Sequence, residues 1–109
     1  MPRFRKSSRM LAPEDFAAVK KRGRAARSGP MAVAFLSGGA VRLGIAVSAA
    51  VGNAVERNRI KRVVREFFRL NRAMFPDGDC VVIPGRGVAQ MKNEEIRQRL
   101  ARALLMLSK

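Results

Sequence analysis

The sequence predicts a single small α+β domain in which helices pack on a small mixed sheet. Three observations lead to this fold class. The 109 residues suffice for one domain with a modest core. A hydrophobic fraction of 48% excludes a disordered basic tail as the description of the whole chain. Hydrophobic patterns follow one another in the order helix, strands, helix, strand, helix.

The first thirty residues contain two basic segments, an N-terminal arm and a connector, with a helix between them. We expect residues 1–9 to form a flexible basic arm and residues 10–109 to form the domain. The first helix begins near Pro13, whose fixed φ suits a first turn, and ends before Gly23. Residues 20–30 read as a charged connector rich in small residues.

A hairpin is predicted next. It pairs a strand over Met31–Ser37 with a second strand over residues 40–48, through a tight turn at Gly38-Gly39. Apolar side chains alternate onto one face of the second strand, at Val41, Leu43, Ile45 and Val47. The other face carries Arg42, Gly44, Ala46 and Ser48. The small side chains among these, at Gly44, Ala46 and Ser48, either leave a groove or admit a close-packed helix, and the pattern favours neither.

The long helix expected over residues 54–74 is the most informative element. Asn53 is its N-cap, Glu56 completes a capping box, and Phe75-Pro76 marks its end. One side of the helix is apolar, with Ile60, Val63, Phe67 and Leu70. On the other side the cations fall within an arc of roughly 140°. They are Arg57, Lys61, Arg62, Arg65, Arg69 and Arg72.

This cationic stripe lacks acidic partners, since only Glu56 and Glu66 lie on the same helix. A solvated charged face normally pairs Glu with Lys four residues apart, and like charges at that spacing destabilise a helix. A polyanion therefore explains the stripe better than solvation does. The net charge of +15 likewise favours nucleic acid or an anionic membrane surface as the partner.

The last two elements complete the domain. Residues 79–83 form a short apolar strand of the kind found inside a sheet. A final helix starts at Asn93, with Glu94 and Glu95 in its first turn. Its apolar stripe is expected to be core and comprises Ile96, Leu100, Ala103, Leu104 and Leu107.

The composition argues against catalysis by the protein itself. There is no histidine, and no Cys, His or paired-carboxylate cluster has the spacing of a metal site. We expect Asp77 and Asp79 to shape a turn around Gly78, with a loose magnesium contact as the alternative. The single Cys80 is expected to be buried. We predict no catalytic residue and no metal site in the protein.

The chain contains no pattern typical of a signal peptide or a membrane span. We therefore expect a soluble, cytoplasmic protein without a membrane partner. DNA is disfavoured as a partner, because the basic helix follows a hairpin pattern and not the short helix and turn of a DNA-reading motif.

A resemblance to a known family narrows these expectations. Residues 51–69, VGNAVERNRIKRVVREFFR, resemble the signature of the protein subunit of bacterial ribonuclease P, whose Arg-Asn-Arg motif appears here as Arg57-Asn58-Arg59. Weaker matches follow the family's order at Asp15-Phe16, Arg22-Gly23-Arg24, Arg42-Leu43-Gly44, Val47-Ser48 and residues 79–83. The resemblance implies the order α-β-β-β-α-β-α with a left-handed crossover between parallel strands.

What the resemblance implies for function is a basic partner of a large catalytic RNA. Together, the two act as an endonuclease that removes the 5′ leader from precursor tRNA, and the catalytic RNA uses Mg²⁺. The protein is then the non-catalytic subunit, and residues 10–109 are an RNA-binding domain. Composition alone leaves one alternative open, which is a structural RNA-binding protein of the ribosome.

The resemblance also implies two sites. In the family the arginine-rich helix contacts the catalytic RNA. Here its contacts are Arg57, Asn58, Arg59, Lys61, Arg62 and Arg65, to which the stripe adds Arg69. Arg59 lies about 60° off the stripe, so it is either an RNA contact or an internal brace. A cleft beside the first helix holds the leader, and its candidates are Phe16, Lys20, Phe35 and Ser48.

The cleft departs from the family's pattern in two places. Lys20 stands where a second aromatic residue is common, and Ala49-Ala50 replace two common lysines. On the sequence alone, the pattern favours core for Phe35 and leaves Phe16 open between core and cleft. The resemblance favours the cleft for Phe16, whose ring can stack a leader base there. With Lys20, a phosphate contact replaces a stacked base, which predicts leader binding that is more sensitive to salt.

Overall fold

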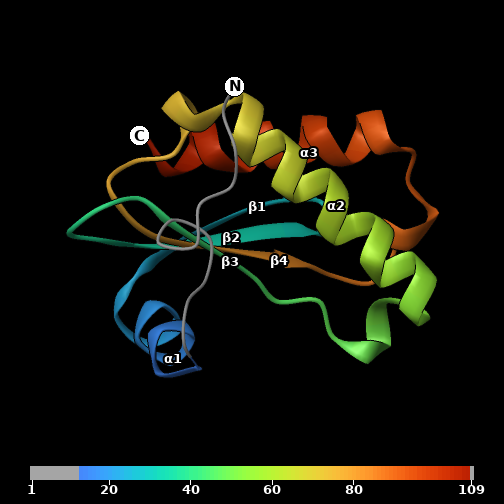
Figure 1. Ribbon diagram of the computed structural model, residues 1–109, viewed down its shortest axis with the longest axis horizontal. Helices are drawn as coiled ribbons and strands as arrows, with labels where there is room; N and C mark the ends of the chain where they lie inside the picture. The colour runs from blue at the N-terminus through green and yellow to red at the C-terminus, as the bar shows by residue number, and fades with distance from the viewer. Residues whose placement is uncertain (1–12, 109) are drawn as a thin grey trace.

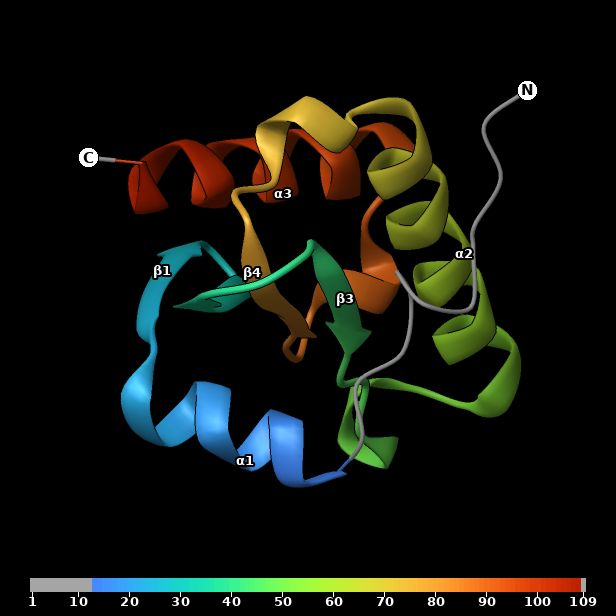
Figure 2. The ribbon, with the colours of Figure 1, turned by 60° about the vertical axis from the view of Figure 1, so that its left-hand side comes forward.

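The computed structural model describes residues 13–108, and the predicted basic arm at residues 1–9 lies outside them. A four-stranded sheet separates one helix, α1, from two others, α2 and α3 (Figures 1 and 2). The helices are α1 (Pro13–Arg22), α2 (Ala54–Leu70) and α3 (Asn93–Leu107). The strands are β1 (Arg24–Ser28), β2 (Met31–Ser37), β3 (Arg42–Ile45) and β4 (Gly78–Pro84). The described residues also form the short 3₁₀ helices η2 (Ala49–Val51), η3 (Arg72–Met74) and η4 (Val88–Gln90).

The α+β class and the α-β-β-β-α-β-α order are confirmed, but the connector predicted over residues 20–30 is wrong. Residues 24–28 are β1, which pairs antiparallel with β2 from Arg24 opposite Phe35 to Ser28 opposite Met31. The strand has no apolar alternation that the sequence could reveal, because it is the edge of the sheet. Exposed arginines on an edge strand also oppose pairing with other chains.

The predicted hairpin is also wrong. The strand order is β1-β2-β4-β3, so β4 lies between β2 and β3. It pairs antiparallel with β2 and parallel with β3, and Cys80 lies opposite both Phe35 and Leu43. Because β4 is apolar on both faces, it occupies the interior position that its sequence predicted. Alternation within residues 40–48 identifies a strand but not its neighbour.

The core has two parts, one on each face of the sheet. The larger lies between the sheet and the pair α2 and α3, and its fully buried side chains include Leu43, Ile60, Phe68, Ile96 and Leu100. The smaller lies under α1 and contains Val19, Ala34 and Val81. The sheet therefore presents one face to α1 and the other to α2 and α3, and alternate residues of each strand divide between them.

The apolar face of α2 differs from the prediction at one position. Leu70 is 64% exposed, whereas Val64 and Phe68 are buried with Ile60, Val63 and Phe67. The α-helix ends at Leu70, four residues before the predicted end, and the chain turns through η3. The Phe75 ring then packs edge-on against Phe67 and Phe68, with centroids 6.1 and 4.8 Å apart, and fills the space beneath the last turn.

Cys80 lies in the centre of β4 and is fully buried, as predicted. Burial raises the pKa of its thiol to about 12, so the reactive thiolate is scarce at neutral pH. Among the helices of residues 13–108, none has both the length and the apolar character needed to cross a membrane.

Candidate nucleic-acid interface

Helix α2 has a fixed orientation on the domain. The Asn53 side chain accepts a hydrogen bond from the Glu56 backbone N–H at 2.8 Å, and the Glu56 carboxylate accepts one from the Asn53 N–H at 2.9 Å. This confirms the predicted capping box, which satisfies backbone donors that a helix start otherwise leaves free. With its apolar face packed on the sheet, α2 must turn the opposite face outward.

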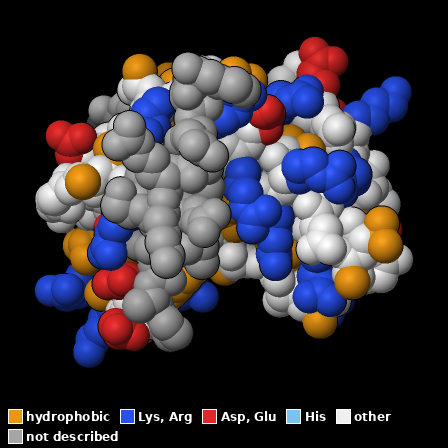
Figure 3. Space-filling model, viewed as in Figure 1, with side chains coloured by type: hydrophobic (Ala, Val, Ile, Leu, Met, Phe, Trp, Pro, Cys, Tyr) orange, Lys and Arg blue, Asp and Glu red, His pale blue; other side chains and the backbone are white. Residues whose placement is uncertain are grey.

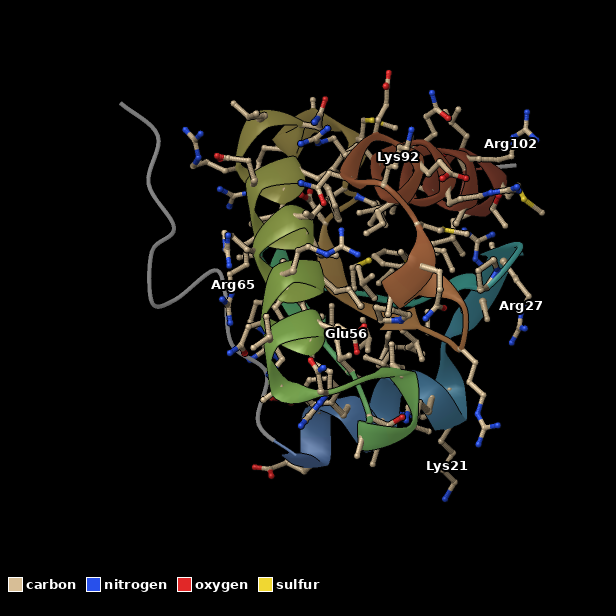
Figure 4. The ribbon with its side chains drawn as sticks, turned by 90° about the vertical axis from the view of Figure 1, so that its right-hand side faces the viewer. Lys21, Arg27, Glu56, Arg65, Lys92 and Arg102 are labelled. Atoms are coloured by element: carbon tan, nitrogen blue, oxygen red, sulfur yellow. The ribbon has the colours of Figure 1, made fainter. Side chains whose placement is uncertain are left out.

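The outward face of α2 carries the predicted cations. Arg62 and Arg65 are exposed, and Arg57 and Lys61 are half-buried. Figure 3 shows Lys and Arg side chains spread over the face of the molecule that α2 crosses. The Arg65 side chain extends from α2 into solvent (Figure 4). Asn58, the middle residue of the Arg-Asn-Arg motif, is also exposed.

Arg69 differs from the rest of the stripe because it has an acidic partner. Its guanidinium donates to both carboxylate oxygens of Glu66 at 2.7 Å. That hydrogen bonding lowers the pKa of Glu66, and the nearby charge of Arg97 lowers this pKa further. Arg69 therefore contributes less uncompensated charge to the outward face than Arg62 or Arg65.

Arg59 is turned toward α3, so the structure gives it the role of a brace. Its Nη2 donates to the backbone carbonyls of Ala89 and Met91 at 2.9 and 3.0 Å, and its Nη1 donates to Asn93 Oδ1 at 2.5 Å. These bonds join α2 to η4 and to the first residue of α3. The planar guanidinium suits this arrangement because it presents several donors in a fixed fork.

A groove of about 350 Å³ runs between α2 and α3. Its floor includes the side chain of Val63, and its walls are mostly arginines from both helices. The residues that line it are Arg59, Arg62, Val63, Arg65, Glu66, Arg69, Asn93 and Arg97. This groove was not predicted, because the sequence placed the cations of α2 on one helix face and indicated only a core role for α3.

The predicted leader cleft is only partly assembled. Phe16 on α1 is half-buried against the small core cluster, near Leu36, Ala46 and Ile83. Lys20 is exposed on the same helix. Ser48 is exposed at the start of η2, where its carbonyl accepts a hydrogen bond from the Val51 N–H at 3.1 Å.

Phe35 does not lie beside Phe16. Its side chain is 7% exposed and belongs to the larger core cluster, on the α2 and α3 face of the sheet. The residues on either side of Phe35 in β2, Ala34 and Leu36, face α1. The structure thus places Phe35 in the core, because successive side chains of a strand point to opposite faces.

An ion-pair cluster at Arg42 was not predicted. The Arg42 guanidinium donates to both carboxylate oxygens of Asp79 at 2.8 Å, and its Nη2 lies 3.4 Å from Asp15 Oδ1. Hydrogen bonding to Asp79, together with the charges of both carboxylates, raises the pKa of Arg42. The cluster ties α1 to β3 and β4. Asp79 is therefore a strand residue, in agreement with the strand predicted over residues 79–83, and its carboxylate pairs with Arg42 and does not shape a turn.

The outward face of α2 is rich in guanidinium groups. Within residues 13–108, no three His, Cys, Asp or Glu side chains are placed to hold a metal ion. Guanidinium groups on the outward face of α2 are suited to bind phosphate bidentately and to stack on exposed bases. The arrangement therefore fits a nucleic-acid backbone.

The chain is similar in sequence and structure to known proteins. The Ribonuclease P family model matches residues 4–108. The ribonuclease P protein component of Desulforapulum autotrophicum is 41% identical over 102 residues, covering 91% of this chain and 87% of that protein. The RNase P protein structure from Staphylococcus aureus gives a TM-score of 0.86 at 31% identity and covers 93% of this chain and 95% of that chain. The corresponding Thermotoga maritima structure gives 0.79 at 33% identity and covers 89% and 94%.

Proposed function

This chain belongs to the Ribonuclease P family, whose members are protein components of ribonuclease P, and we therefore propose that α2 binds the catalytic RNA of that enzyme. The observation that carries the proposal is the outward face of α2, where Arg62 and Arg65 are exposed and have no ion-pair partner within residues 13–108. Family membership does not favour the alternative of a structural ribosomal protein.

In this proposal the chemistry belongs to the RNA. The catalytic RNA, with Mg²⁺ that it binds, cleaves the 5′ leader from precursor tRNA in the cytoplasm, and the protein contributes binding and charge compensation. The donor set of residues 13–108 does not suit Mg²⁺, which prefers carboxylate and other oxygen ligands gathered at one point.

We place the leader of precursor tRNA along the α1 side of the sheet. Phe16 offers a half-buried aromatic face that is suited to stack an unpaired base, and Lys20 and Ser48 offer an exposed cation and an exposed hydroxyl. Phe35 is not part of this proposal, because it lies in the core on the other face.

Replacing Arg62 and Arg65 together with alanine tests the RNA-binding face. We expect affinity for a bacterial ribonuclease P RNA to fall by about 10- to 100-fold, since the variant lacks two guanidinium groups that make charge-assisted contacts to phosphate. Leader cleavage at low magnesium should fall in parallel. The measurements are binding by filter retention and processing of a precursor tRNA.

A matched double variant controls for the change in net charge. Arg27→Ala with Arg102→Ala removes two exposed arginines from β1 and α3, away from the outward face of α2 (Figure 4). It should bind RNA within about threefold of the parent, because long-range charge is screened. If both double variants bind RNA alike, α2 is not the RNA-binding element. If the parent itself restores no cleavage, the proposed function fails.

Replacing Lys20 with phenylalanine tests the leader cleft. We expect the parent to hold a leader phosphate at this position, so its gain in affinity with leader length should weaken as salt rises. Lys20→Phe should make that gain less dependent on salt and more dependent on base identity, as stacking replaces charge. Substrate affinity is measured for several leader lengths at two salt concentrations. Identical behaviour of the two proteins would remove Lys20 from the cleft.

A further inference from the structure

We propose that the groove between α2 and α3 holds a phosphate of the RNA backbone between Arg62 and Arg97, which makes α3 the second wall of the RNA interface. The proposal rests on RNA binding by α2 and extends it to a helix to which the sequence gave only a structural role. It also gives Arg59 a function as the residue that positions the two walls.

Arg97 faces α2 because of its position on α3. It follows Asn93 by four residues, so the two side chains lie on the same side of the helix. Asn93 is held against α2 by Arg59, and both Asn93 and Arg97 line the groove. The effect of Arg97 on the pKa of Glu66 places its charge near α2 as well. Arg97 is nevertheless exposed to solvent.

The charges of the groove are unbalanced. Five arginines line it against one carboxylate, that of Glu66, which is bound by Arg69 at both oxygens. Arg59 is engaged by two carbonyls and an amide oxygen. Among residues 13–108, no hydrogen bond or ion pair engages the side chains of Arg62, Arg65 and Arg97, and Arg97 is the one of these three that belongs to α3.

Two facing guanidinium groups repel each other unless an anion lies between them. A phosphate suits the position because its oxygens accept from two planar forks at once. An RNA backbone is favoured over a free anion, because Arg62 and Arg69 belong both to the groove and to the outward stripe of α2. A strand that follows the stripe therefore reaches the groove without a break in positive charge.

The Arg59 brace sets the width of the groove. Its bonds to the carbonyls of Ala89 and Met91 hold the chain just before α3 against the middle of α2. Arg97 lies one turn after the braced Asn93, so its distance from α2 depends on these bonds. Arg59 is thus a positioning residue for the groove.

The test compares Arg97→Ala with Arg62→Ala and with Arg102→Ala. Arg102 lies on the same helix, is exposed, and lines a different groove beside Ser28, so its loss changes the net charge equally. We expect Arg97→Ala to weaken binding of a ribonuclease P RNA by about fivefold or more and to lower the slope of log Kd against log salt by about one. Arg102→Ala should stay within about twofold of the parent.

A double variant tests whether the two arginines share one phosphate. If they do, Arg62→Ala and Arg97→Ala together should weaken binding by less than the product of the single effects. If Arg62→Ala weakens binding while Arg97→Ala matches Arg102→Ala, this inference is overturned and RNA binding by α2 stands. Equal losses for Arg97→Ala and Arg102→Ala would also overturn it, because they indicate unspecific charge. If none of the variants changes affinity, the proposed function itself fails.

Discussion

Replacing Phe68 with alanine should lower the free energy of unfolding by about 3–5 kcal/mol, the range for phenylalanine truncation in a packed core. The Phe68 side chain is 1% exposed, and its ring packs edge-on against Phe75 with centroids 4.8 Å apart. The guanidinium carbon of Arg72 also lies over the Phe68 ring, 5.0 Å from its centroid. The truncation removes all these contacts and leaves a cavity beneath the last turn of α2.

The measurement is urea unfolding of the parent and the variant at fixed salt and anion concentration. A loss of this size is a large share of the stability of a small domain. Val55→Ala is the control on the same helix, because Val55 is 77% exposed and its truncation should change stability by less than about 0.5 kcal/mol. Similar unfolding curves for the two variants would show that the core beneath α2 is packed differently.

Replacing Arg59 with alanine should lower the free energy of unfolding by about 1.5–3 kcal/mol, the usual effect of losing hydrogen bonds to a charged group. The carbonyls of Ala89 and Met91 and the Asn93 amide oxygen lose their shared donor. Arg59→Lys should recover only part of the loss, since one ammonium cannot reproduce a planar fork. RNA affinity should also fall, because α3 is no longer held at a fixed distance from α2.

Urea unfolding again measures the effect, with Arg65→Ala as the control for charge. Arg65 is exposed on the same helix, and no ion pair of residues 13–108 engages its side chain. Arg65→Ala should weaken RNA binding and leave stability within about 0.5 kcal/mol of the parent. If Arg59→Ala shows the same pattern as Arg65→Ala, Arg59 is an RNA contact and not a brace.

The elements that the sequence predicted well are those whose signal is local. The capping box at Asn53 and Glu56 fixed the start of α2, and the apolar repeat from Ile96 to Leu107 fixed the buried face of α3. Wholly apolar β4 indicated an interior strand. In each case the signal lies within a few neighbouring residues, so the local sequence is enough to place the element.

The features that the sequence did not predict depend on pairing between distant segments. β1 is a strand only because β2 supplies its hydrogen-bond partners, and β3 joins β4 and not the strand that precedes it. The same register brings Arg42 opposite Asp79, so an ion pair formed that no local pattern indicated. Sheet register also sent Phe35 to the face away from Phe16.

The sequence by itself determined the cationic stripe of α2, because a helix of known start and period has only one outward face. The tertiary structure decided how that stripe is used. Arg69 of the stripe and Arg59 beside it are engaged by groups within the protein, and Arg97 of α3 faces the stripe across a groove. The physical reason is that helical period acts within a few residues, whereas the packing of α3 on α2 joins residues more than thirty positions apart.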